Sequence, residues 1–225
     1  MTSTSRAARP GILLRRSTLA TGMAGLLALA LTACEKGPDR AAVAAQLKAD
    51  VEAQLQVVES NTAEKVLSHS AVTVTPNDDD RYLVAIDGLK FQPDAEGYLD
   101  IGTISYIAKP KDEQDYEVSD LKIAPEIPFK GADGKEKGKL ALTTKSFSGL
   151  WSRELGVFRK FDSEFADISA TDDKGADLRL AGLKFTGELA DKGGGVFDST
   201  GTATLSGLKA KDSTGDGVFG IGETT

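Results

Sequence analysis

The spacing of hydrophobic and polar residues changes along the chain, and each change predicts a different kind of segment. Residues 19–31 are almost wholly apolar. From Asp39 to about Ser60 the apolar residues recur every three or four positions, which predicts a helix with one apolar face. This face consists of Val43, Leu47, Val51, Leu55 and Val58. Its polar side lacks the Lys and Arg enrichment of membrane-surface helices, so packing on a core is favoured over lying on a membrane.

From His69 onward, short runs alternate between apolar and polar positions and are separated by turn-forming residues. Alternation with period two predicts strands, and clusters of Gly, Asp, Asn and Lys predict the turns between them. The alternating pairs are Val72 and Val74, Leu99 and Ile101, Tyr116 and Val118, Leu140 and Leu142, Leu178 and Leu180, and Thr202 and Thr204. The turn-like breaks are residues 77–80, 131–134, 172–175 and 192–195.

A short pattern, in which Gly or Asp is followed by Leu, recurs five times in this region. Successive copies are 25 to 33 residues apart. In each copy the apolar alternation shifts by one position, which predicts a β-bulge at the central residue. The central residues are Gly88, Asp120, Gly149, Gly182 and Gly207. About 30 residues form two strands and two turns, and regular bulges curve a sheet.

The expected fold is therefore mainly β (α+β). A helical segment (residues 39–67) precedes a long curved antiparallel sheet of repeated bulged hairpins (residues 68–225). The chain stops soon after the last copy of the pattern, so we expect the last repeat to be cut short.

The N-terminal segment predicts export and a lipid anchor. Four arginines and no acidic residue precede the apolar stretch, as in a secretory signal. The stretch is shorter than the roughly 20 residues that span a membrane, which argues against an uncleaved anchor. It ends in Leu31-Thr32-Ala33-Cys34, and Cys34 is the only cysteine. This motif resembles the lipobox of bacterial lipoproteins.

That resemblance implies that residues 1–33 are a signal peptide, that Cys34 is acylated, and that residues 34–38 form a lipidated tether. It further implies a protein anchored in the cell envelope and facing the periplasm. Glu35 rather than Asp follows the cysteine, which favours the outer membrane over the inner one. Arg15-Arg16 is similar to a twin-arginine signal, but Thr18 stands where that signal prefers an apolar residue, so the export route stays open.

Charge and chemistry narrow the function classes. The net charge is −7, and removal of residues 1–33 with their four arginines makes it about −11. An acidic domain of this kind is unsuited to nucleic acid, so no nucleic-acid partner is expected. His69 is the only histidine, and its neighbours Ser68 and Ser70 would point to the opposite face of a strand.

We therefore expect no enzyme activity, no catalytic residue, no metal site and no cofactor. Residues from Asp212 to Glu223 have the spacing of a calcium loop. Such a loop lies between two helices, however, whereas the preceding residues here predict a strand, so a hairpin turn is the better interpretation.

The densest apolar stretch after the signal runs from Phe147 to Phe165 and includes the single tryptophan. This stretch either packs in the core or forms an apolar binding surface. The spacing of its apolar residues from Trp151 to Phe161 is compatible with a short helix. The candidate binding surface consists of Phe147, Trp151, Leu155 and Phe158.

Over about residues 70–225, the repeated Gly-Leu-Lys pattern resembles that of uncharacterised proteobacterial envelope β-repeat proteins and, more distantly, of groove-forming lipid-transfer proteins. The resemblance implies a non-enzymatic protein that binds an apolar or lipid-like ligand on a curved sheet. Its membrane contact would be made through acylated Cys34. The alternative is an envelope structural or assembly protein that binds another protein through its sheet.

Overall fold

The computed structural model describes residues 39–61, 66–193, 196–212, 214 and 217–224, which belong to one compact unit. Cys34, the signal segment and the tether lie outside the described residues. The described part of the chain contains one helix and eleven strands. They are α1 (Arg40–Asn61), β1 (Leu67–Ser68), β2 (Ala71–Pro76), β3 (Tyr82–Phe91), β4 (Gly97–Pro110), β5 (Asp115–Lys122), β6 (Glu126–Gly131), β7 (Glu136–Ser152), β8 (Val157–Asp172), β9 (Asp177–Gly193), β10 (Val196–Lys211) and β11 (Gly217–Thr224).

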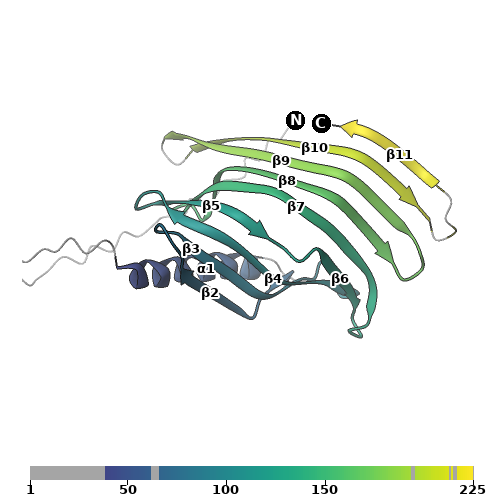
Figure 1. Cartoon of the computed structure of the whole chain (residues 1–225), viewed down its shortest axis with the longest axis horizontal. Coiled ribbons are helices and arrows are strands. Elements are labelled where there is room, and N and C mark those ends of the chain that lie inside the picture. The colour runs from purple at the N-terminus through teal and green to yellow at the C-terminus, as the bar shows by residue number, and fades with distance from the viewer. Residues whose placement is uncertain (1–38, 62–65, 194–195, 213, 215–216, 225) are drawn as a thin grey trace, which may run out of the picture. The chain divides into compact units, whose positions relative to one another are not determined.

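All eleven strands belong to a single antiparallel sheet, so the expectation of a mainly β protein is confirmed. The order of its strands is β1-β3-β4-β5-β7-β8-β9-β10-β11, with β2 beside β3, and β6 between β4 and β7. The long strands β7 to β10 bend together, and α1 lies on the concave side of the sheet (Figure 1). Each predicted alternating pair lies on a strand. The break at residues 77–80 lies between β2 and β3, whereas those at 131–134 and 172–175 begin at the last residue of a strand. Of the break at 192–195, residues 192–193 end β9 and residues 194–195 lie outside the described part of the chain.

The helix begins where the sequence predicts. The Asp39 side chain accepts hydrogen bonds from the backbone N–H groups of Ala41 at 3.0 Å and Ala42 at 3.4 Å, and so caps the first turn. The helix ends at Asn61, and Leu67 lies on β1, so the predicted helical segment 39–67 is too long at its C-terminal end.

The helix buries its apolar face on the sheet. Leu47 and Val51 are buried, with Val43 and Leu55 partly so. Val58 was expected on the same face but is 40% exposed. In that turn the sheet-side contact is made by Glu59, whose Oε1 lies 2.7 Å from His69 Nδ1.

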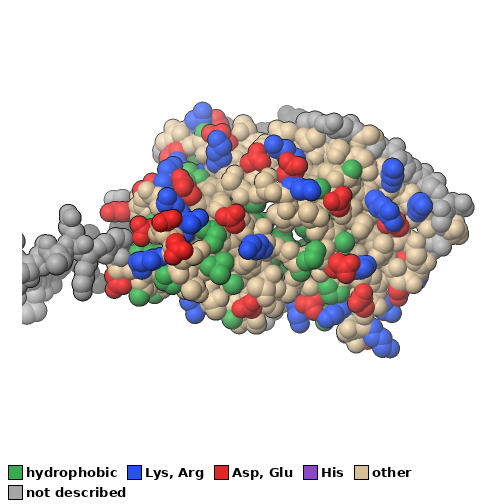
Figure 2. Space-filling view, in the orientation of Figure 1, with side chains coloured by type: hydrophobic (Ala, Val, Ile, Leu, Met, Phe, Trp, Pro, Cys, Tyr) green, Lys and Arg blue, Asp and Glu red, His purple; other side chains and the backbone are tan. Residues whose placement is uncertain are grey.

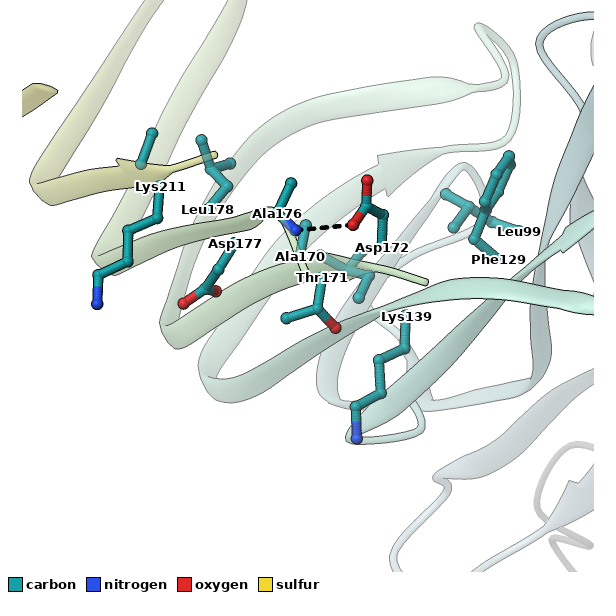
Figure 3. A pocket seen from close by; sticks show the side chains of 12 residues that line it. Leu99, Phe129, Lys139, Ala170, Thr171, Asp172, Ala176, Asp177, Leu178 and Lys211 are labelled. Carbon is teal, nitrogen blue, oxygen red and sulfur yellow. Dashed lines mark hydrogen bonds between the residues drawn. The ribbon is translucent and has the colours of Figure 1, made fainter. Parts of the chain in front are cut away.

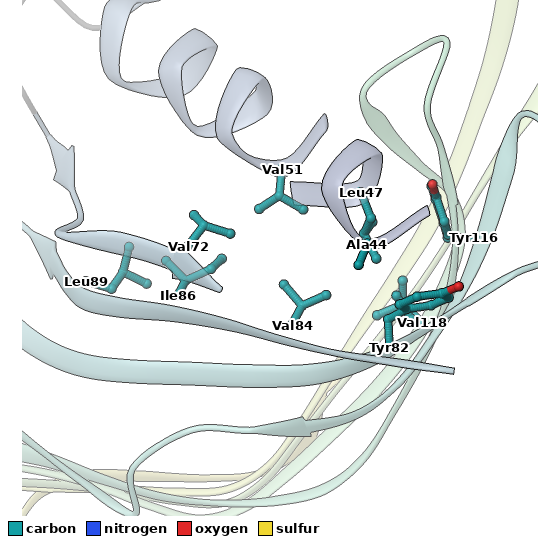
Figure 4. Packing of buried hydrophobic residues seen from close by; sticks show 11 residues of the cluster. Ala44, Leu47, Val51, Val72, Tyr82, Val84, Ile86, Leu89, Tyr116 and Val118 are labelled. Carbon is teal, nitrogen blue, oxygen red and sulfur yellow. The ribbon is translucent and has the colours of Figure 1, made fainter. Parts of the chain in front are cut away.

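The core forms between α1 and the first strands of the sheet (Figure 4). Val72 on β2, Tyr82 and Val84 on β3, and Ala108 on β4 are each at most 2% exposed. Burying large aliphatic side chains contributes roughly 1.5–3 kcal/mol each, so this cluster is what fixes the helix against the sheet.

The predicted bulges are confirmed at two of the five positions. Gly88 has φ 61° and Asp120 has φ 54°, and the strand register shifts at both sites. Gly207 has φ 64°, but its strand keeps one register with β9 on either side of it. Across β9, Asp167 on β8 also has positive φ, at 52°, and both residues fall opposite Ala181. The two residues with positive φ thus flank β9 at the same level, and the register of β7 with β8 shifts beside Asp167.

Gly149 and Gly182 are not bulge residues, which corrects the prediction for those two copies. Neither has a positive φ, and both pair regularly with their neighbours. Gly149 has a different role: a Cβ placed there would lie 2.7 Å from the ring of Phe158. One of the three register shifts between β7 and β8 falls just beyond Gly149, between Leu150 and Trp151.

Candidate functional site: an apolar cavity beneath the helix

A cavity of about 240 Å³ lies between α1 and the concave face of the sheet. The helix and five strands contribute its walls. The lining residues are Leu47, Val51, Gln54 and Leu55 from α1, Ile86 from β3, Ile104, Tyr106 and Ala108 from β4, Tyr116, Val118 and Leu121 from β5, Phe147 and Trp151 from β7, and Phe158 from β8.

The chemistry of this lining is almost wholly apolar. None of these described residues carries a charge, and the polar groups among them are the Gln54 amide, two tyrosine hydroxyls and the Trp151 indole. Phe158 is 37% exposed and lies on the solvent side of the cavity. An apolar hollow with few polar groups is the usual form of a small-molecule site.

Three of the four predicted surface residues come together here. Phe147 and Phe158 meet edge to face, with ring centroids 5.7 Å apart. Trp151 packs beside Tyr116 at 5.9 Å. These rings form one wall of the cavity, and Phe147 and Trp151 also pack against the core.

Leu155 is the exception and does not line the cavity. It lies in the turn between β7 and β8, where the structure has no helix, so the short helix admitted by the spacing is wrong. Paired strands instead bring Trp151 opposite Phe158. The lining residues that sequence reasoning missed are those of α1, β3, β4 and β5, because their contact with the aromatic stretch depends on tertiary packing.

Of the two tyrosines that line the cavity, Tyr116 is 3% exposed and Tyr106 is partly buried. Burial raises the pKa of its hydroxyl well above the ordinary value. Within the described chain no hydrogen-bond partner contacts this hydroxyl. Tyr106 therefore places a hydroxyl group in the lining of an otherwise largely apolar site.

An ion pair ties the helix to the far side of the cavity. Arg153 Nε donates to Asp50 Oδ2 at 2.7 Å, and Arg153 Nη1 donates to the Glu113 carbonyl oxygen at 2.8 Å. The guanidinium also lies over the Tyr116 ring, 5.7 Å from its centroid. Burial is the largest cause of the raised pKa of Tyr116, while the positive charge of Arg153 opposes the rise.

A second, more open hollow of about 380 Å³ lies farther along the sheet (Figure 3). Leu99 and Phe129 lie on one side of it and Leu178 on the other. Leu178 is 42% exposed. Two of the charged residues that line this hollow form ion pairs inside the protein: Lys139 contacts Glu126 at 2.8 Å and Asp177 contacts Arg179 at 2.7 Å.

On the face shown in Figure 2, patches of hydrophobic side chains lie between mixed acidic and basic groups. Acidic and basic side chains are interspersed on this face, and neither forms a single large patch there. The described part of the chain holds no group of three or more His, Cys, Asp or Glu residues arranged for a metal ion. The stretch from Asp212 links β10 to β11, and parts of it lie outside the described residues.

No protein-family model, curated protein or solved structure matches this chain. Among the described residues, no helix has both the length and the apolar character needed to cross a membrane.

Proposed function

We propose that this protein is a lipid-anchored, non-enzymatic protein of the cell envelope that binds a lipid-like aliphatic ligand in the cavity beneath α1. The observation that carries the ligand proposal is the uncharged, aromatic-rich lining of that cavity. The anchoring proposal depends on the lipobox-like motif at Cys34.

The size of the cavity limits the ligand. An engineered cavity of about 150 Å³ holds benzene, and pockets for drug-sized ligands begin at about 300 Å³. At about 240 Å³, this cavity suits one short aliphatic chain or part of an acyl chain. A whole phospholipid would have to extend beyond it.

Binding of this kind should follow chain length. Each buried methylene contributes about 0.8 kcal/mol, which corresponds to roughly a fourfold gain in affinity. We expect the dissociation constants of straight-chain 1-alkanols to fall by about this factor per added carbon until the cavity is full.

Trp151 provides the measurement, because it is the only tryptophan and it lines the cavity. The full chain carrying Cys34→Ser, which cannot be acylated, is titrated with 1-alkanols of four to ten carbons while Trp151 emission is recorded. The expected result is a saturable change in emission with the stated dependence on chain length.

Two variants of neighbouring residues on β4 make the test specific. Ala108 lines the cavity, so Ala108→Leu should fill it and remove the response. Lys109 is exposed and lines the opposite face of the strand, so Lys109→Leu should bind as the parent chain does. Equal responses from both variants would contradict the proposed site. A parent chain that binds no alkanol would favour the alternative, an envelope protein that holds another protein through its sheet.

A further inference from the structure

The turn between β7 and β8, residues 153–156, lies beside the cavity, and we call it the strap. It connects the strand that carries Trp151 to the strand that carries Phe158, and these two residues face each other and line the cavity. Gln54 of α1 also lines the cavity, and it packs directly on the strap, because a Cβ at Gly156 would collide with Gln54 Oε1. The strap therefore spans from the aromatic wall of the cavity to the helix.

The lining is most accessible on the side of the strap. Phe158 is 37% exposed, and Gln54 and Leu55 are partly buried. By contrast, Leu47 and Ala108 are at most 1% exposed. A molecule from solvent therefore reaches the cavity most directly past Phe158, between α1 and the strap.

One side chain ties the strap to the helix. Arg153 Nε donates to Asp50 Oδ2 at 2.7 Å, and between described residues this is the only hydrogen bond from the strap to α1. The other bonds of Arg153 lead to the turn between β4 and β5: Nη1 donates to the Glu113 carbonyl oxygen and the backbone N–H to the Gln114 carbonyl oxygen, both at 2.8 Å. The bond to Asp50 thus decides whether the strap stays against the helix.

We infer that the strap is a gate: when the bond between Arg153 and Asp50 breaks, residues 153–156 move away from α1, and a ligand enters or leaves the cavity through this opening. This inference depends on the proposed function, because it describes how the ligand of the same cavity exchanges. Neither Arg153 nor Asp50 lines the cavity. Their bond should therefore control the rate of exchange and leave the affinity unchanged.

The test measures the rate constants of 1-octanol binding by stopped-flow recording of Trp151 emission in the full chain carrying Cys34→Ser. Loss of a hydrogen bond between charged groups changes an opening equilibrium by about tenfold. Arg153→Gln and Asp50→Asn should each raise the association and dissociation rate constants together by about this factor. The dissociation constant, which is their ratio, should stay the same.

Arg179→Gln is the matched control. Arg179 Nε donates to Asp177 Oδ2 at the same distance of 2.7 Å, but neither residue lines the cavity. This substitution should change neither rate constant. Unchanged rate constants in Arg153→Gln, with 1-octanol still bound, would overturn the gate while the proposed function stands. A weaker affinity at an unchanged association rate constant would show that Arg153 shapes the cavity, and would also overturn the gate.

A second measurement needs no ligand. Acrylamide is a small neutral quencher of tryptophan emission, and an open strap would give it easier access to Trp151. The quenching constant should be higher for Arg153→Gln and Asp50→Asn than for the parent chain and for Arg179→Gln. If no alkanol binds the parent chain, the proposed function fails, and quenching alone then decides the inference: higher constants in the first two variants support the gate, and equal constants overturn it.

Discussion

Gly88 and Gly182 occupy the same place in the repeated sequence pattern, but their backbones differ. Gly88 has φ 61°, whereas Gly182 lies in regular strand. A Cβ at Gly88 would also approach Ser70 Oγ to 2.6 Å, and one at Gly182 would approach Ser206 Oγ to 2.9 Å. A rotatable hydroxyl relieves the second contact, but no side-chain movement relieves a left-handed backbone.

We therefore predict that Gly88→Ala lowers the free energy of unfolding by about 1–2 kcal/mol, as expected for a side chain in the left-handed region. Gly182→Ala should lower the free energy of unfolding by less than about 1 kcal/mol. Urea unfolding of the two variants measures the difference. Equal losses would contradict the distinction drawn from their backbone angles.

The repeat predicted part of this residue-scale picture correctly. The shift in apolar alternation predicts bulges, and the strand register does shift at Gly88 and Asp120, whereas Gly207 has a positive φ without a shift in register. The pattern could not separate these residues from Gly149, where glycine leaves room for the Phe158 ring. That ring comes from the adjacent strand, and its contact with Gly149 is a matter of register that the local pattern does not contain.

The titration of Tyr106 makes stability depend on pH in the alkaline range. Burial raises the pKa of the Tyr106 hydroxyl in the folded state above the ordinary value of about 10. As pH rises above that value, the unfolded chain loses this proton while the folded protein keeps it, which favours unfolding. The contribution of the Tyr106 side chain to the free energy of unfolding is therefore fully present below about pH 10 and is lost progressively as pH rises above that value. We predict that the urea midpoint of Tyr106→Phe falls less between pH 8 and pH 11 than that of the parent chain. An identical fall of the urea midpoint in the two chains would contradict this prediction. Tyr98→Phe serves as the control, because Tyr98 is on the same strand but does not line the cavity.

At the scale of elements, α1 is held by its apolar face and by the Asp50–Arg153 ion pair. The two side chains are only 18% and 29% exposed, and the bond is short at 2.7 Å. Partly buried, charge-assisted bonds are stronger than surface pairs. A double-mutant cycle with Asp50→Asn and Arg153→Gln should give a coupling energy of about 1–2 kcal/mol in urea unfolding.

The same helix offers a comparison pair. Lys48 and Glu52 are 3.6 Å apart and each is 47% exposed, so their coupling should be about 0.3–0.5 kcal/mol. If the two cycles give equal coupling energies, the ion pair with Arg153 has no special part in holding the helix.

The existence of the helix and of the strands follows from periodicity, as the cap at Asp39 and the burial of Leu47 and Val51 illustrate. The cavity does not follow from it, because no local pattern says which strands a helix covers. Leu155 shows the limit: its spacing from Trp151 suits a helix, but strand pairing with β8 determines its place and leaves it in a turn.

At the scale of the whole molecule, we propose that the protein is attached to the membrane through Cys34. The mature chain would be strongly acidic, which opposes adsorption to an anionic bilayer, and stable attachment needs more than one acyl chain. We predict that Cys34→Ala, expressed in a bacterial host, moves from the membrane fraction to the soluble periplasmic fraction and no longer incorporates labelled palmitate. Because Cys34 is the only cysteine, the substitution breaks no disulfide. Retention equal to that of the unsubstituted chain would contradict the lipid anchor.

The arrangement of β7 to β11 has a consequence for how such a protein can evolve. Each of these strands pairs with the strand before it in the chain. The cavity takes its lining from α1 and from strands no later than β8. Duplication or loss of a hairpin beyond β8 would thus change the length of the sheet while sparing the cavity. The reach of the concave face and the selectivity of the cavity are separately adjustable properties of this architecture.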